Sequence, residues 1–223
     1  MSPLKTDVPL RSVPWVNLAL ILAMVALHIV VVLEPETSPR GALSARDPRL
    51  VQFLTYPFLH LGLLHLLGNV LAQALFGGNI NDRMGHLGYA AFFLAGGVVA
   101  GMGFLATTRS GAVVGASGAI GAVIGAYLVL LPKANIVLFE RVRIPSIYPI
   151  TAYFILNLVM AISTTTLVAR WAHISGLVFG VALTLVLLAL KIIPPDEQDA
   201  ISLVSHFRRQ STQDRDGKEE RPT

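Results

Sequence analysis

Six apolar segments dominate this chain, and each comes close to the length that a bilayer-spanning helix requires. Such a helix needs about 20 mostly apolar residues, and the segments lie at 15–33, 59–78, 88–106, 116–131, 147–167 and 172–192. Only 13% of the 223 residues are charged, whereas soluble domains carry about 25%. The sequence therefore predicts an all-α, polytopic membrane protein built as a bundle of six transmembrane helices.

Polar sequence flanks the apolar region on both sides and divides the chain into three parts. We expect a cytoplasmic N-terminal segment at 1–14, a membrane domain at 15–193 and a largely disordered cytoplasmic tail at 194–223. With six spans, 12 of the 17 Lys and Arg residues fall on one side. The positive-inside rule assigns that side, and with it both termini, to the cytoplasm. The first span carries no small-residue cleavage pattern and no targeting extension precedes it, which favours an uncleaved span in a bacterial plasma (inner) membrane.

Composition also bears on what the chain can bind. It contains no Cys, which excludes thiol catalysis, disulfides and Cys-ligated metals. The net charge of +4 is modest, and its distribution fits membrane orientation better than nucleic-acid binding. No His-Glu-x-x-His pattern occurs, which disfavours a zinc protease. We expect contact with a lipid bilayer, no nucleic-acid partner, no metal and no cofactor.

Polar residues inside spans are expensive and usually functional, and four of them fall at one level of the membrane. Ser117 opens the fourth segment and His173 the sixth, while His65 and Asn69 lie in the half of the second segment nearest to them. Ser117 is 14 residues from Leu131, about 21 Å of helix, which places it roughly 9 Å inside a hydrocarbon core about 30 Å thick. The chain at 107–116 must then enter the membrane as irregular structure, which is tolerated only where protein or water satisfies the backbone.

A Ser and a His on two different spans are typical of a nucleophile and its base. No Asp or Glu lies in the same half of any span, so a Ser117–His173 dyad fits better than a triad. His65 and Asn69 are four residues apart, share a helix face and, with the Ser117 backbone N–H, can stabilise an oxyanion. Their structural alternative is hydrogen bonding between helices. His60 does not share that face and is interpreted as a structural residue at the start of the second span.

Glycines follow both polar residues at three- or four-residue spacing: Gly118 and Gly121 with Gly125 in the fourth segment, and Gly176 and Gly180 in the sixth. Small residues spaced in this way allow membrane helices to approach closely. Gly115 precedes the Ser in the same motif. We expect these glycines to support the site by bringing Ser117 and His173 together.

With these motifs the sequence resembles the rhomboid family of intramembrane serine proteases. The resemblance covers about 53–185 and consists of Phe58-Leu-His60 with His65 and Asn69, Asn81-Asp-Arg-Met-Gly-His86, Gly115-Ala-Ser-Gly118, and Ala172-His-Ile-Ser-Gly176 with Gly180. It implies a six-span bundle with Ser117 and His173 as the catalytic dyad. His65, Asn69 and Ser117 would form the oxyanion hole.

The resemblance also implies substrates that are single-span membrane proteins, cut near the outer end of the span after lateral entry past the fifth span and the loop near Thr164–Arg170. Two positions depart from the family's pattern. Residues 34–57 contain no Trp to anchor the first loop. Gly121 stands where some members carry an aromatic residue that stacks on the catalytic His.

Three other functions fit parts of the sequence. A rhomboid-like protein that binds membrane clients without cutting them usually lacks the Ser or the His, and both are present here. A transporter would place polar residues along a path, but no internal repeat with paired broken helices is visible. A b-type haem protein could use His65 and His173 but leaves Ser117 and Asn69 unexplained. The sequence favours a Ser-His intramembrane endopeptidase.

Overall fold

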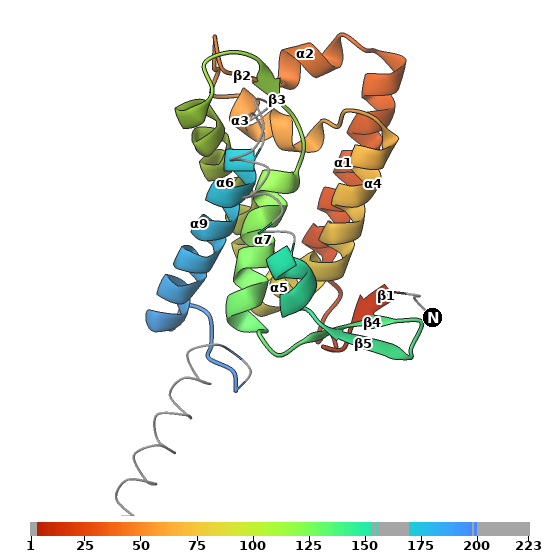
Figure 1. The fold of residues 1–223 in the computed structure, drawn as a ribbon, viewed down its shortest axis with the longest axis vertical. Coiled ribbons are helices and arrows are strands. Elements are labelled where there is room, and N and C mark those ends of the chain that lie inside the picture. The colour runs from red at the N-terminus through yellow and green to blue at the C-terminus, as the bar shows by residue number, and fades with distance from the viewer. Residues whose placement is uncertain (1–3, 153–154, 156–169, 198, 200–223) are drawn as a thin grey trace, which may run out of the picture.

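The fold was analysed in a computed structural model that describes residues 4–152, 155, 170–197 and 199. Helices dominate it, in agreement with the predicted helical membrane protein (Figure 1). In chain order the helices are α1 (Trp15–Leu33), α2 (Thr37–Gly41), α3 (Gln52–Thr55), η1 (Tyr56–Phe58), α4 (Leu63–Ala72), η2 (Gln73–Gly77), α5 (Gly78–Met84), α6 (His86–Thr107), α7 (Ser117–Leu130) and α9 (Arg170–Ala189).

Within the described residues, four helices are long and apolar enough to cross a membrane. They are α1, the continuous run of α4, η2 and α5 from Leu63 to Met84, α6, and α9. The helix α7 is shorter, with 14 residues, close to the 21 Å expected of it. Residues 147–152 are helical, but most of the predicted span 147–167 and the loop from Thr164 to 169 lie outside the described residues. The count of six spans therefore stays a prediction.

The second span begins at Leu63 and ends at Met84, several residues later at both ends than its apolar run. His60 consequently lies before the helix rather than in it. At its centre, Gln73–Gly77 adopt a π-helix. The amide of Gln73 donates to Asn17 Oδ1 at 2.9 Å and to the Tyr89 hydroxyl at 2.7 Å, so the wide turn coincides with a buried polar cluster that links three spans.

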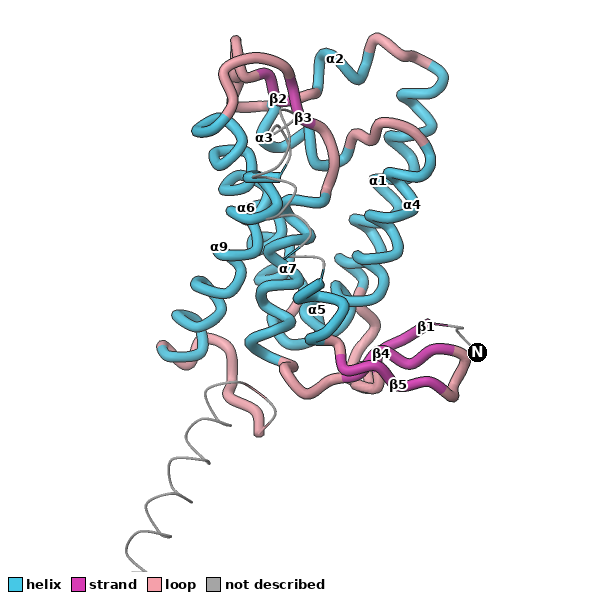
Figure 2. Tube along the Cα trace, in the orientation of Figure 1, coloured by secondary structure: helices cyan, strands magenta, loops and turns pink. Residues whose placement is uncertain are grey.

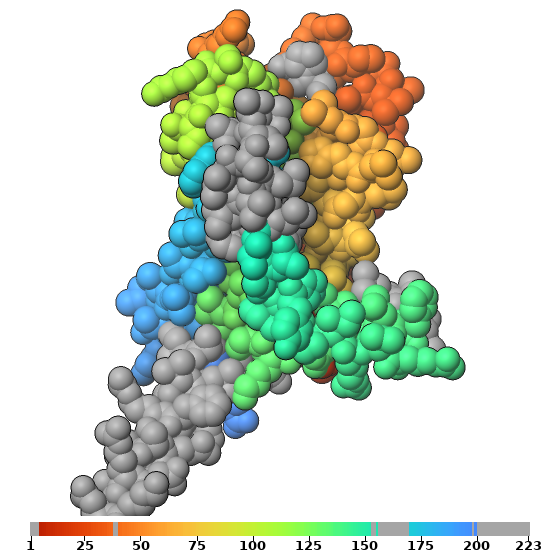
Figure 3. Space-filling view, viewed as in Figure 1, coloured from red at the N-terminus to blue at the C-terminus, as the bar shows by residue number. Residues whose placement is uncertain are grey.

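Two small sheets lie at opposite ends of the bundle (Figure 2), and neither was predicted. At one end β2 (Leu43–Ser44) pairs with β3 (Ala112–Val113). At the other, β1 (Leu4–Thr6), β4 (Asn135–Leu138) and β5 (Val142–Pro145) form an antiparallel sheet in the order β1-β4-β5. The sheet of β4 and β5 projects from the body of the molecule (Figure 3).

The helix α7 is the centre of the fold. Twelve of its 14 residues are buried, and it packs most extensively against α9 and α6. The first loop is anchored without a Trp, because Leu43 and Phe53 contact α6 at Gly101, where a Cβ atom would come within 2.9 Å of both side chains. The contact of Leu43 and Phe53 with Gly101 holds the first loop in place of the Trp that some members of the family carry there.

The segment Leu4–Ser12, which we call the N-terminal strap, lies at the end of the bundle that carries the β1-β4-β5 sheet. We call this end the strap end. The Asp7 carboxylate of the strap accepts from the backbone N–H and the side-chain amide of Asn135 at 2.8 and 2.7 Å. Arg11 forms an ion pair of 2.9 Å with Asp196. The strap therefore joins the β4–β5 hairpin to the segment that follows α9, an arrangement that the plain polar composition of residues 1–14 did not predict.

Candidate functional site

Ser117 is the first residue of α7, and α7 begins at its end that points away from the β1-β4-β5 sheet (Figure 1). The chain reaches it through an irregular segment, as expected for 107–116, apart from the short pairing of β3. Gly115 has a φ of +118°, a backbone conformation that only glycine adopts without strain. The first backbone N–H groups of a helix have no partner within it, so the N–H of Ser117 is available to a ligand at this position.

Ser117 and His173 meet across the two helices. The Oγ of Ser117 lies 2.6 Å from Nε2 of His173, a hydrogen bond between side chains that are 56 residues apart in the chain. His173 is the fourth residue of α9, so both groups sit at the starts of their helices. This is the geometry in which an imidazole can take the proton of a hydroxyl.

The predicted glycines account for this approach. A Cβ atom at Gly121 would lie 3.0 Å from the carbonyl oxygen of His173, and one at Gly176 would overlap the carbonyl oxygen of Gly118. A Cβ atom at Gly180 would likewise overlap the carbonyl oxygen of Ala122. Backbone therefore packs on backbone along α7 and α9, and at Gly121 the contact is with the main chain of His173 instead of a stacked aromatic ring.

His65 and Asn69 lie beside the pair, as their shared face predicts. The ring of His65 sits against Gly115, where a Cβ atom would come within 2.6 Å of its Cε1. The Asn69 amide donates to the carbonyl oxygen of His65 at 2.8 Å, which leaves its second N–H for another acceptor. Both residues line the same cavity as Ser117 and His173.

His60 is buried and packs edge-on against His65, with ring centroids 5.1 Å apart. Its Nδ1 lies 3.3 Å from the carbonyl oxygen of Phe58. These contacts fit the structural role that the sequence suggested, since His60 supports the ring of His65 and is not among the residues that line the cavity.

Tyr56 supports the site and was missed from the sequence. Its backbone carbonyl accepts the N–H of Gly115 at 2.9 Å, and its hydroxyl donates to the carbonyl oxygen of Gly97 at 2.6 Å. The side chain is 1% exposed. A single aromatic residue in a helix as short as η1 gives no pattern from which such a role could be predicted.

A cavity of about 500 Å³ opens at the Ser-His pair. We call it the site cavity. Besides His65, Asn69, Ser117 and His173, the described residues that line it are apolar or glycine: Leu64, Gly68, Leu71, Ala72, Leu75, Phe76, Ile120, Ile124, Ile136, Pro149 and Ile150. Its wall includes residues 149–150, where the predicted fifth span begins. Within the part of the chain that the structure describes, no three His, Asp or Glu side chains lie close enough together to hold a metal ion.

Comparison with known proteins agrees with the motifs. A model of the Rhomboid domain matches residues 47–190, nearly two thirds of the chain. The chain is also similar to the presenilin-associated rhomboid-like protein, mitochondrial, of Homo sapiens, Pongo abelii and Mus musculus, with 28% identity over 134 residues in each case. The match covers 56% of this chain and 34% of each relative, so the chain spans about a third of the length of the curated relatives it matches.

Proposed function

Because the chain belongs to the rhomboid family, we propose that it is an intramembrane serine endopeptidase that cuts single-span membrane proteins near the outer end of the span. The observation that carries the proposal is the 2.6 Å contact between Ser117 Oγ and His173 Nε2. It is supported by the apolar cavity at that pair, which suits a hydrophobic segment of substrate.

In the proposed reaction, His173 Nε2 takes the proton of Ser117 Oγ as the oxygen attacks the substrate's carbonyl carbon. The carbonyl oxygen becomes an oxyanion, stabilised by the Ser117 N–H and by His65 and Asn69. When the C–N bond breaks, His173 returns the proton to the leaving amine. Water, activated by the same imidazole, then hydrolyses the acyl ester and regenerates the Ser117 hydroxyl.

The proposed roles set a hierarchy among the site residues. Ser117 and His173 act on the reacting atoms and are the catalytic residues. Asn69 and His65 bind developing charge, and loss of one such donor costs about 3 kcal/mol in the transition state, or roughly a hundredfold in kcat. His60, Gly115, Gly118, Gly121, Gly176 and Gly180 support the arrangement.

The proposal is tested by incubating a single-span reporter protein with the purified full chain and with the variants Ser117→Ala and His173→Ala. Wild-type cleavage that disappears in both variants is the expected result. A fluorophosphonate probe should label wild type and not Ser117→Ala, which reports the nucleophile without depending on the choice of reporter.

Equal cleavage by all three proteins, or failure of the probe to label wild type, would contradict the proposal. The alternative function, a module that binds membrane clients without cutting them, would then remain. That module would still capture the reporter, since its binding does not depend on the Ser117 hydroxyl.

We also propose that both termini face the cytoplasm, in a bacterial plasma membrane. The strap and the segment after α9 lie at one end of the bundle, where Arg11 and Arg83 both contact Asp196, which supports placement of the two terminal segments on the same side. The relatives are named as mitochondrial proteins, so the membrane itself is tested by fractionation. Labelling of single Cys residues introduced at Ser2 and Thr223 in spheroplasts tests the orientation.

A further inference from the structure

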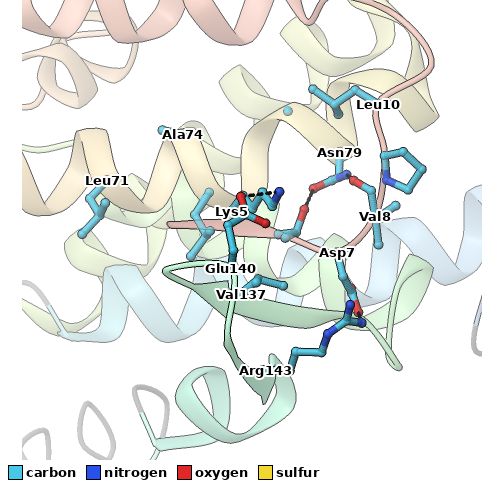
Figure 4. A pocket seen from close by; sticks show the side chains of 14 residues that line it. Lys5, Asp7, Val8, Leu10, Leu71, Ala74, Asn79, Val137, Glu140 and Arg143 are labelled. Carbon is cyan, nitrogen blue, oxygen red and sulfur yellow. Dashed lines mark hydrogen bonds and ion pairs between the residues drawn. The ribbon is translucent and has the colours of Figure 1, made fainter. Parts of the chain in front are cut away.

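A second cavity, of about 670 Å³, lies at the strap end of the bundle. It lies between the second span and the sheet made by the strap and the β4–β5 hairpin (Figure 4). We call it the strap cavity. None of the proposed catalytic residues lines it, although Leu71 and Leu75 line both this cavity and the site cavity.

One wall of the strap cavity is apolar and belongs to the membrane-facing side of the second span. Leu71 and Ala74 lie on this wall (Figure 4) and are exposed. The same helix face continues away from the strap through Leu67 and Leu64, which are 51% and 86% exposed. An apolar stripe therefore runs from the cavity along the surface where lipid chains lie in an integral membrane protein.

The opposite wall is charged and balanced in sign. Lys5 and Glu140 form an ion pair of 2.7 Å, and both side chains remain close to half exposed. Arg143 lies 3.8 Å from Asp7 and is 71% exposed, a separation and exposure at which an ion pair contributes little. Asp7 already accepts two hydrogen bonds from Asn135. The exposed side chains of Arg143, Lys5 and Glu140 are thus the charged groups that can bind a ligand in this cavity.

We propose that the strap cavity binds a phospholipid of the adjacent leaflet whose headgroup carries both a phosphate and a primary ammonium. The phosphate would take the guanidinium of Arg143, which binds phosphate oxygens in a bidentate manner, with Lys5 beside it. The ammonium would donate to the carboxylate of Glu140. One acyl chain would follow Leu71, Leu67 and Leu64 along the second span.

The equal numbers of positive and negative side chains in the described lining favour a headgroup that carries both a phosphate and an ammonium. The charged residues that line the cavity, within the described part of the chain, are two cations and two carboxylates. Glu140 is paired with Lys5, so an anionic headgroup that draws Lys5 away and brings no ammonium would leave the Glu140 carboxylate facing a like charge. A quaternary choline group has no N–H to donate to that carboxylate. An ethanolamine-type headgroup satisfies both signs.

The test is native mass spectrometry of the purified full chain with equimolar phosphatidylethanolamine, phosphatidylcholine and phosphatidylglycerol of identical acyl chains. We expect roughly tenfold preferential retention of the ethanolamine lipid. Arg143→Gln and Glu140→Gln should each reduce it to the level of the choline lipid. Arg141→Gln is the matched control, because Arg141 is exposed on the same hairpin and does not line the cavity.

A second variant tests the apolar wall without changing charge. Ala74→Phe places a ring on the exposed wall of the cavity and should reduce retention of all three lipids, while its thermal unfolding stays that of wild type. Equal retention of the three lipids by wild type, preference for the anionic lipid, or a preference that survives both charge substitutions would overturn the proposal. None of these readouts depends on proteolysis, so they stand apart from the proposed catalytic function.

Discussion

Gly115 cannot be replaced without strain by a residue with a side chain for two independent reasons, its backbone conformation and the lack of space at its Cβ position. Its φ of +118° is strained for any residue with a Cβ atom, and the space that a Cβ would need is filled by the His65 ring. Gly111 offers a comparison within the same irregular segment, since its φ is +92° and nothing lies within 4 Å of its Cβ position.

We therefore predict that Gly115→Ala and Gly111→Ala lose similar amounts of stability, about 1–3 kcal/mol from backbone strain, but differ in activity. Gly115→Ala should lower kcat at least about tenfold because it displaces the proposed oxyanion donor His65. Gly111→Ala should leave kcat near that of wild type. Thermal unfolding of both variants measures the loss of stability, and reporter cleavage measures kcat. Equal kcat values for the two variants would show that His65 has no part in the proposed mechanism.

At this scale the sequence predicted the residues that carry recognisable chemistry. Ser117, His173, His65 and Asn69 are polar residues in apolar segments, and a shared depth was enough to group them. Tyr56 was not predicted, because its contribution consists of a carbonyl and a hydroxyl that fix backbone at Gly115 and Gly97. Such contacts depend on tertiary placement, which no local pattern of an isolated aromatic residue encodes.

Helix packing is the next scale, and the contact of α7 with α9 sets the distance between the two proposed catalytic groups. Gly176 lies against the carbonyl oxygen of Gly118 with no room for a methyl group. We predict that Gly176→Ala forces the two helices apart, destabilises the protein by about 1–3 kcal/mol through overpacking and reduces fluorophosphonate labelling of Ser117. Gly88→Ala in α6 is the control, since its Cβ would meet only ordinary van der Waals contact at 3.7 Å.

The measurements are the free energy of unfolding in detergent micelles and the rate of probe labelling. Gly88→Ala should match or slightly exceed wild-type stability, because Ala is the better helix former. If Gly176→Ala labelled as fast as wild type, the close packing of α7 on α9 would be unnecessary for the reactivity of Ser117.

Elements whose identity follows from local apolarity were predicted well, and those that depend on distant partners were not. The bounds of α1 agree with the apolar run at 15–33, and α7 begins and ends within a residue of its segment. The π-helix at Gln73–Gly77 and the pairing of Leu4–Thr6 with Ile136–Leu138 were missed. The latter joins residues 130 to 134 positions apart, and strand pairing over such a separation leaves no signal in a segment of three residues.

The strap acts on the scale of the whole molecule, because it connects the start of the chain to the second span, the β4–β5 hairpin and the segment after α9. Asn79 of the second span accepts from the Thr6 hydroxyl at 2.9 Å and donates to the carbonyl oxygen of Val8 at 3.2 Å, and a carboxylate makes the other polar contacts with the strap. Asp82 accepts the backbone N–H groups of Arg11 and Ser12 at 3.0 and 2.9 Å and the Ser12 hydroxyl at 2.7 Å. Hydrogen bonds to a charged acceptor are the stronger kind, although these are solvent-exposed.

We predict that Asp82→Ala loosens the strap without unfolding the bundle. If the exposed contacts together hold the strap by about 1 kcal/mol, their loss raises the open population roughly fivefold. Trypsin should then cleave after Lys5 or Arg11 about five times faster in the full chain. Cleavage after Arg49, in an exposed loop that makes no hydrogen bond or ion pair with the strap among the described residues, serves as an internal control and should not change. Asp47→Ala removes a carboxylate paired only locally with Arg49 and should leave cleavage at the strap unaffected. Parallel acceleration at Arg49 in Asp82→Ala would show instead that Asp82 stabilises the bundle as a whole.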